Sequence, residues 1–214
     1  VSTMDWSPDG KWIVYAHAHS PGVNDNVYSD ISMINVSTGE IKNVANTAAG
    51  ESQPFFSPDG KSIAYFALND EGIWSAMTYI KVVPVSGGRA ITLANTPNEP
   101  SSLVGWSGDS RYVYVSEPYH TTQKVFRLSA DGKNITEWGA NNKDVISSIE
   151  LNDRKTHFGL VMQNTTRPGE AYMSSCASFS PVKISNVNAD IADYPVPKTE
   201  VIRWKSFDGM EIEG

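Results

Sequence analysis

The sequence predicts an all-β fold, a β-propeller made of four-stranded blades, and three observations support this prediction. The segment WSPDGK at 6–11 returns 50 residues later as FSPDGK at 56–61, and a weaker copy, WSGDSR, stands at 106–111. A fixed period of this length is typical of a stacked supersecondary unit. Each copy places a turn ahead of an apolar strand, and only 19% of the residues are charged, which favours strands and turns over helices.

The first repeat predicts its elements one by one. The motif favours a tight turn because Pro8 presets φ, Asp9 can bond the backbone and Gly10 can adopt a positive φ. We expect no strand ahead of this turn. After it we expect an apolar core strand at 12–16, a polar loop at 20–30, a strand at 31–36, a turn at 37–40 and an outer strand at 41–45.

The later repeats follow the same order. Strands are expected at 62–67, 79–85 and 90–93 in the second repeat, at 112–115, 125–128 and 135–138 in the third, and at 157–162, 170–173 and 182–184 in a degenerate fourth that starts near residue 149. We place the blades near 6–50, 56–98, 106–145 and 149–190, within a propeller portion that spans 1–198.

The number of blades bears on closure of the ring. A single four-stranded sheet buries too little surface alone, so neighbouring blades must stack face to face. A β-sandwich is the competing fold, but it would not repeat a motif at this period. Propellers usually have about four to eight blades, so we expect this chain to be part of a larger propeller. An open ring exposes apolar faces and strand edges, which predicts reduced stability relative to the full domain and self-association.

Composition excludes several classes of function. The formal net charge of −7 argues against a nucleic-acid partner, which would require a basic surface. The chain has no apolar run long enough to span a membrane, so we expect a soluble protein, and the sequence leaves cytoplasm and periplasm equally open. Cys176 is the only cysteine, which rules out an intrachain disulfide, and we expect it to be a buried, inert thiol.

The last residues depart from the repeat. Residues 200–205 are expected to form a strand, 206–209 a turn and 210–214 the start of a return strand. This tail, with KSFDG at 205–209 and IEG at 212–214, resembles the linker and first hairpin of the catalytic domain in prolyl oligopeptidase-family serine peptidases. RPGEAY at 167–172 is similar to a last-blade segment of the acylaminoacyl-peptidase and dipeptidyl-peptidase-like branch, except that Ala171 stands where Val or Leu is usual.

The resemblance implies a division of labour within a longer protein. The family joins a propeller to an α/β-hydrolase domain whose nucleophile lies in G-x-S-x-G, and this motif is absent here. The triad Asp and His follow the Ser in chain order, so they too would lie beyond Gly214. We therefore expect 1–198 to be non-catalytic and to control access of small peptides, and 199–214 to lead into the hydrolase domain, its partner in the same chain.

Candidate contact residues are few. Glu117, Tyr119 and His120 lie between core strands of the third blade, where blade-rim loops can meet substrate or the neighbouring domain. His17 and His19 share a strand face but lack a third ligand, and 20–29 lacks the calcium-loop spacing, so we expect no metal and no cofactor. Two other functions stay open, a propeller scaffold that binds partner proteins and, ranked last, an enzyme acting on polysaccharide.

Overall fold

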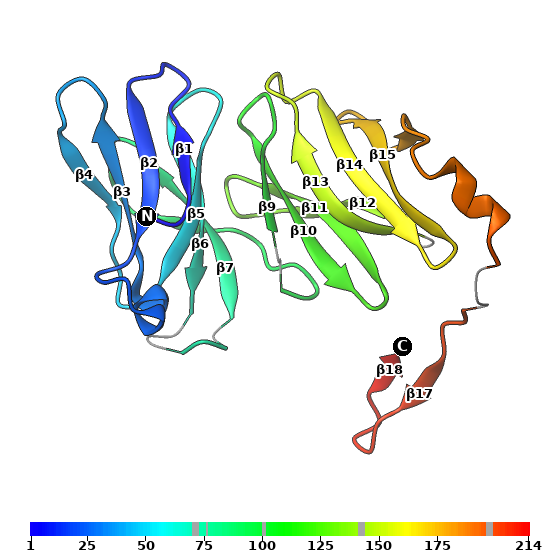
Figure 1. Cartoon of the computed structure of the whole chain (residues 1–214). Coiled ribbons are helices and arrows are strands. Elements are labelled where there is room, and N and C mark those ends of the chain that lie inside the picture. The colour runs from blue at the N-terminus through cyan, green and yellow to red at the C-terminus, as the bar shows by residue number, and fades with distance from the viewer. Residues whose placement is uncertain (70–72, 76, 100–101, 141–143, 196–198) are drawn as a thin grey trace.

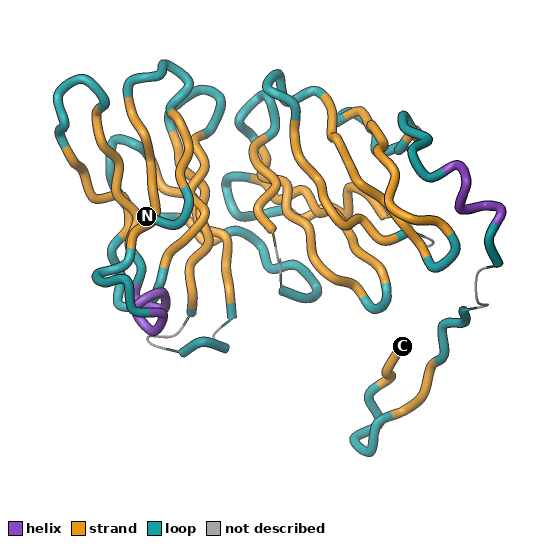
Figure 2. Tube along the Cα trace, in the orientation of Figure 1, coloured by secondary structure: helices purple, strands orange, loops and turns teal. Residues whose placement is uncertain are grey.

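The computed structural model describes residues 1–69, 73–75, 77–99, 102–140, 144–195 and 199–214. Its strands form four antiparallel sheets of four strands each, followed by a separate hairpin, which confirms the predicted all-β blades (Figures 1 and 2). The strands of the first two sheets are β1 (Met4–Trp6), β2 (Trp12–His17), β3 (Asp30–Asn35), β4 (Ile41–Ala45), β5 (Glu51–Phe56), β6 (Ser62–Leu68), β7 (Thr78–Pro84) and β8 (Ile91–Thr92).

The second half of the chain repeats this meander. Its strands are β9 (Ser102–Trp106), β10 (Tyr112–Tyr119), β11 (Thr122–Ser129), β12 (Ile135–Ala140), β13 (Val145–Leu151), β14 (His157–Asn164), β15 (Arg167–Ser175) and β16 (Val182–Lys183). In every sheet the strands pair in chain order. The tail hairpin consists of β17 (Arg203–Lys205) and β18 (Glu211–Glu213).

The repeated motif closes the hairpin between the first two strands of a blade. In the first blade, Ser7 Oγ donates to Asp9 Oδ1 at 2.7 Å and accepts the Trp12 backbone N–H at 2.9 Å. The Ser57–Asp59 pair makes the same contact at 2.6 Å. The motif is thus a hydrogen-bonded cap that sets the start of the core strand.

The third and fourth blades keep the turn geometry without its glycine. Gly10 and Gly60 have φ values of 68° and 69°, and Ser110 and Lys155 adopt φ values of 60° and 54° at the corresponding places. This left-handed conformation is strained for residues with a Cβ. The backbone shape of the repeat is therefore preserved where its sequence has drifted.

The expectation that no strand precedes the first turn was wrong. Met4–Trp6 forms β1, which pairs with β2 in the register Met4–Tyr15 and Trp6–Ile13. The tight turn brings the chain straight back, since Ser7 N–H donates to the Trp12 carbonyl at 2.9 Å, and the residues before it therefore lie beside β2.

The predicted polar loop at 20–30 also holds more structure than expected. A 3₁₀ helix spans Val23–Tyr28, and Val27 within it is 4% exposed. Gly50 lies against the Val27 backbone so closely that a Cβ on Gly50 would approach it to 2.9 Å. One apolar side chain thus anchors the loop onto the start of the second blade.

Three apolar clusters join consecutive sheets. The first packs Val14 and Ile31 of the first sheet against Ile63 and Tyr65 of the second. The second cluster joins the second and third sheets and includes Trp106, whose indole N–H also donates to the Phe55 carbonyl at 3.0 Å. The third joins the third and fourth sheets, and together the clusters explain why the blades stack.

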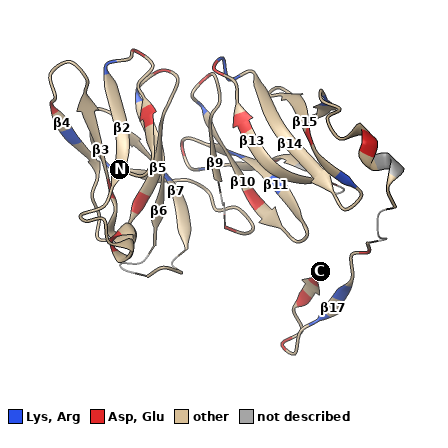
Figure 3. Cartoon of the chain, viewed as in Figure 1, with Lys and Arg blue, Asp and Glu red and all other residues tan. Residues whose placement is uncertain are grey.

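The outward face of the first sheet carries large apolar side chains. Trp6, Ile13, Ile34 and Ile41 are paired across neighbouring strands and therefore share one face. Trp6 is 54% exposed and Ile41 58% exposed. Acidic and basic residues are distributed along all four sheets (Figure 3). Within the part of the chain that the structure describes, no helix has the length and apolarity to span a bilayer.

Candidate interdomain face

The two ends of the blades differ in character. One end carries the motif turns, and the opposite end carries the loops between second and third strands and the links between blades. The tail hairpin β17–β18 lies beside the loop end of the third and fourth blades (Figure 1). Hydrogen bonds between Thr121 and Glu213 join the hairpin to that end.

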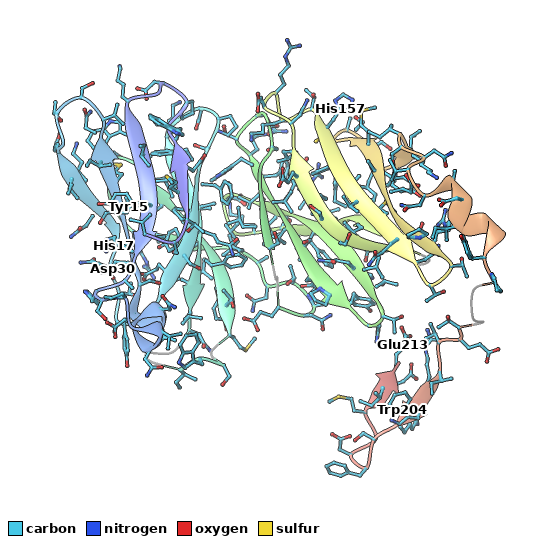
Figure 4. The ribbon with its side chains drawn as sticks, in the orientation of Figure 1. Tyr15, His17, Asp30, His157, Trp204 and Glu213 are labelled. Carbon is cyan, nitrogen blue, oxygen red and sulfur yellow. The ribbon has the colours of Figure 1, made fainter. Side chains whose placement is uncertain are left out.

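The contact joins Glu213 of β18 to the β10–β11 turn. Glu213 Oε1 accepts the Thr121 backbone N–H at 3.2 Å and the Thr121 hydroxyl at 2.7 Å. Its other oxygen, Oε2, accepts from Arg203 Nε at 2.8 Å and from an Arg203 terminal nitrogen at 2.7 Å. Every carboxylate oxygen is therefore used, and Figure 4 shows Glu213 on the side of the hairpin nearest the blades.

This environment favours the charged form of Glu213. The Thr121 hydroxyl and then the Arg203 guanidinium lower the pKa of Glu213 to about 2. The side chain is only 7% exposed, whereas Arg203 is 64% exposed. A carboxylate covered on both sides and held by charge-assisted bonds is a specific contact, and not a solvated end of a strand.

A cavity of about 530 Å³ lies beside this contact. It is lined by Thr121 and Thr122 of the third blade, Gln163 and Asn164 of the fourth, and the 199–201 segment that leads to the hairpin. The loop end of two blades and the segment after the propeller therefore enclose one space.

The predicted contact residues lie around the same turn. Tyr119 ends β10, and its ring packs edge-on against the His120 ring with centroids 4.6 Å apart. His120 is exposed and has a φ of 54° in the tight turn. Lys124 Nζ lies 3.7 Å from the centre of the Tyr119 ring. Tyr119 and His120 are thus next to Thr121, which makes the contact with the hairpin.

Glu117 has a different environment. It is fully buried, its Oε1 accepts the Asn98 backbone N–H at 3.2 Å, and its Oε2 has no hydrogen-bond partner among the described residues. Asn98 also donates to the Pro118 carbonyl at 2.9 Å. Glu117 therefore holds the link between the second and third blades against β10.

Sequence reasoning missed Thr121 and Glu213. Neither belongs to a motif, and 92 positions separate them. The signal available in the sequence was the tail itself, because a hairpin that follows the repeats must lie somewhere against them. Only the tertiary structure identifies which turn receives it.

The histidine pair and the cysteine complete the list of candidates. His17 Nε2 is 3.0 Å from Ser32 Oγ, and His19 Nε2 is 3.8 Å from Asp30 Oδ2 (Figure 4 labels His17 and Asp30). Among the described residues, no three His, Cys, Asp or Glu side chains gather as a metal site. Cys176 is half-buried, and burial raises the pKa of its thiol to about 11.

The chain is similar in sequence to known proteins. No protein-family model matches the chain. It is similar to the dipeptidyl-peptidase 5 of Porphyromonas gingivalis, with 30% identity over 117 residues, and to that of Trichophyton equinum, with 35% identity over 83 residues. The matches cover 53% and 38% of this chain but 17% and 11% of those proteins. The chain therefore spans a small part of the curated relatives that it matches.

Solved structures share the fold across most of the chain. A puromycin hydrolase gives a TM-score of 0.65 at 14% identity over 98% of this chain and 32% of its own. Prolyl oligopeptidase B from Galerina marginata gives 0.62 at 13% identity over 99% and 38%. TolB from Acinetobacter baumannii gives 0.65 at 15% identity over 85% and 42%. These likenesses support the propeller fold.

Proposed function

We propose that this chain is a propeller segment of a prolyl oligopeptidase-family serine peptidase, and that it forms the non-catalytic, access-controlling part of an enzyme that hydrolyses small peptides. The chemistry belongs to a hydrolase domain of the same parent chain. Stacked blades over an active site admit short or unfolded peptides and keep out folded proteins and bulk water.

One observation carries this proposal, the contact between Thr121 and Glu213. The hairpin β17–β18 is the segment that resembles the start of a hydrolase domain, and it lies against the loop end of the third blade. We therefore assign this end to the face that the hydrolase domain covers. Tyr119 and His120 are assigned to the same face, as contacts to that domain or to a peptide, because they directly precede Thr121 in the β10–β11 turn.

The reading frame provides the first test. Downstream of residue 214 we expect a G-x-S-x-G motif followed by an Asp and a His. A frame that stops near residue 214 would contradict the proposal.

The docking of the hairpin provides the second test, and it can be made on this chain. Arg203 and Lys205 are exposed trypsin sites on β17. Thr121→Val removes the hydroxyl donor and Glu213→Gln removes the charge, so both should speed cleavage after these residues. Glu211→Gln is the control, because Glu211 lies on the same hairpin and is 62% exposed. Equal cleavage rates in all four proteins would argue against a docked hairpin.

Kinetic assays on the full-length peptidase distinguish a change in substrate access from a loss of folded protein. We expect Glu213→Gln to raise kcat/KM for longer peptides relative to dipeptide-releasing substrates, because a loosened contact widens access. Glu211→Gln should leave that ratio unchanged. A uniform loss on all substrates would indicate a structural defect and would count against gating.

A partner-binding scaffold is the second candidate. In fold alone, TolB gives the same TM-score of 0.65 as the puromycin hydrolase, over 85% of this chain against 98%. A stable protein partner, together with the absence of a hydrolase domain from the parent gene, would favour the scaffold.

A further inference from the structure

An arginine takes the place of an apolar residue at one position of the repeat. In the first two blades, Met33 lies opposite Val14 and Val82 lies opposite Ala64. In the third blade, Arg127 lies opposite Tyr114, in the same register. Met33 and Val82 are buried core residues, so the repeat provides an apolar environment at this position. A charge there requires compensation.

Aromatic rings cover the Arg127 guanidinium. Its Cζ lies 4.3 Å from the centre of the Tyr112 ring and 3.9 Å from that of Trp138. Trp138 is the extra residue of a bulge in β12, since Val125 pairs with Gly139 and Phe126 with Glu137. Bulges redirect side chains, and this one brings the indole over the guanidinium. The ring contacts leave the hydrogen-bonding edge of Arg127 for another partner.

Two buried donors at this stack have no partner. Arg127 Nε and Trp138 Nε1 are both inaccessible and lack hydrogen bonds within the described residues. A buried donor without an acceptor is costly, and such groups are rare in native proteins. Both donors are N–H groups, so the missing partner is an acceptor.

The adjoining cavity is rich in positive charge. It measures about 520 Å³, lies between the third and fourth blades, and is lined by Arg111, Arg127 and Lys155 among others. Asp109 is the sole carboxylate among the described residues that line it, and it already accepts from Ser107 and Arg111. His157, which also lines the cavity, marks this region at the motif-turn end (Figure 4).

We propose that this cavity is a binding site for an oxyanion, a carboxylate or phosphate group that accepts from the terminal nitrogens of Arg127, beside the Trp138 indole. The edge of a guanidinium offers two parallel donors, which match either group. Lys155 and Arg111 supply further positive charge at the rim. The site lies at the motif-turn end, away from the face assigned to the hydrolase domain, so it is independent of the proposed peptidase role.

The test is a titration followed by the Trp138 indole N–H signal in a ¹⁵N NMR spectrum. Sodium phosphate and sodium acetate are added separately at constant ionic strength, with chloride as the balancing salt. Trp138→Phe assigns the signal among the six tryptophans of the chain. We expect a saturable shift with at least one of the two anions, and the anion that saturates first identifies the preferred group.

Matched variants connect the shift to Arg127. Arg127→Met introduces the residue that the first blade has at this position and should abolish both the shift and the anion-dependent rise in the unfolding midpoint. Arg111→Met removes an equal charge from the rim and should keep most of the response. Arg127→Lys, which keeps the charge without the planar fork, should weaken the apparent affinity for the anion at least tenfold.

Two results would overturn the proposal. One is a Trp138 signal that does not move, or moves without saturation, with both anions. The other is an equal rise in the unfolding midpoint of wild type and Arg127→Met, since that is a general salt effect. If Arg127→Met fails to fold, the wild-type and Arg127→Lys titrations decide alone.

Discussion

The junction between the second and third blades and the junction between the third and fourth have the same architecture but different chemistry. The first is filled by apolar residues such as Phe66, Val82 and Leu128. The second also has an apolar core, which includes Phe158 and Leu160, but Trp138 packs against that core and Arg127 stacks on Trp138. The repeat thus determines how blades pack, and departures from it at equivalent positions indicate where a blade has acquired another role.

Exchanging the residue types at the equivalent positions 82 and 127 should have the largest effect on the free energy of unfolding. Val82→Arg places a charge at a position that is 5% exposed within an apolar cluster, and we expect a loss of about 3 kcal/mol or more in the free energy of unfolding. Arg127→Val should change it by only about 1 kcal/mol, because apolar replacement of a half-buried charge is often neutral. Urea unfolding measures both, and equal losses would show that the two positions are not distinct.

Removing apolar volume from the second-to-third junction comes next. Leu128 is 1% exposed, so Leu128→Ala should cost about 2–5 kcal/mol through lost burial and the cavity it leaves. Ile135→Ala on the neighbouring strand is the control, because Ile135 is 37% exposed. A Leu128→Ala cost similar to that of the control would mean that this junction contributes little.

Acid should weaken the motif turns of the blades on either side of both junctions. The Ser57 and Ser107 hydroxyls lower the pKa of Asp59 and Asp109 below the ordinary 3.8. A lowered pKa in the folded state stabilises the protein above the unfolded pKa, and this stability is lost as pH falls through the folded value. We expect unfolding free energy to drop below about pH 4, and Asp59→Asn to flatten that drop.

Asp5 is the control of opposite sign. Burial raises its pKa, although its Oδ2 accepts the Phe56 backbone N–H at 2.8 Å. Its protonation at low pH therefore offsets part of the loss, and Asp5→Asn should make the acid drop steeper. An unchanged slope in both variants would contradict these assignments.

The outward face of the first sheet, against which no other sheet of the described residues packs, contrasts with the packed junctions. The outward face of the first sheet, which includes Trp6, should promote self-association of this chain. Sedimentation should show concentration-dependent mass that Trp6→Lys reduces. Trp74→Lys, at a loop residue that is 57% exposed, should not reduce it. A monomer at every concentration would refute the prediction.

The smallest effect concerns the thiol at the third-to-fourth junction. Burial raises the pKa of Cys176 to about 11, with Lys155 opposing the shift. Alkylation by iodoacetamide at pH 8 should therefore be much slower than that of a free cysteine, because the thiolate is the reactive form. Labelling at the rate of free cysteine would show an accessible, ionised thiol instead.

Much of the fold was predictable because its signals are local. The motif turns predicted the hairpins, and core strands such as β2 and β6 were expected to within two residues of their observed ends. The expected strands 112–115 and 125–128 were too short, because β10 and β11 extend to meet at the 120–121 turn. The ends of these strands contain polar residues, including Glu117 and Lys124, so the apolar pattern used for the prediction stopped short of them.

By itself, the sequence determined the blade repeat, its turn chemistry and the hairpin that ends it, because each depends on residues within a few positions of one another. The tertiary structure decided which turn receives Glu213 and which blade face surrounds Arg127. Both depend on residues brought together by stacking, such as Thr121 and Glu213, 92 positions apart. Stacking is driven by apolar burial that has no direction of its own, so the partners it creates carry no local signature.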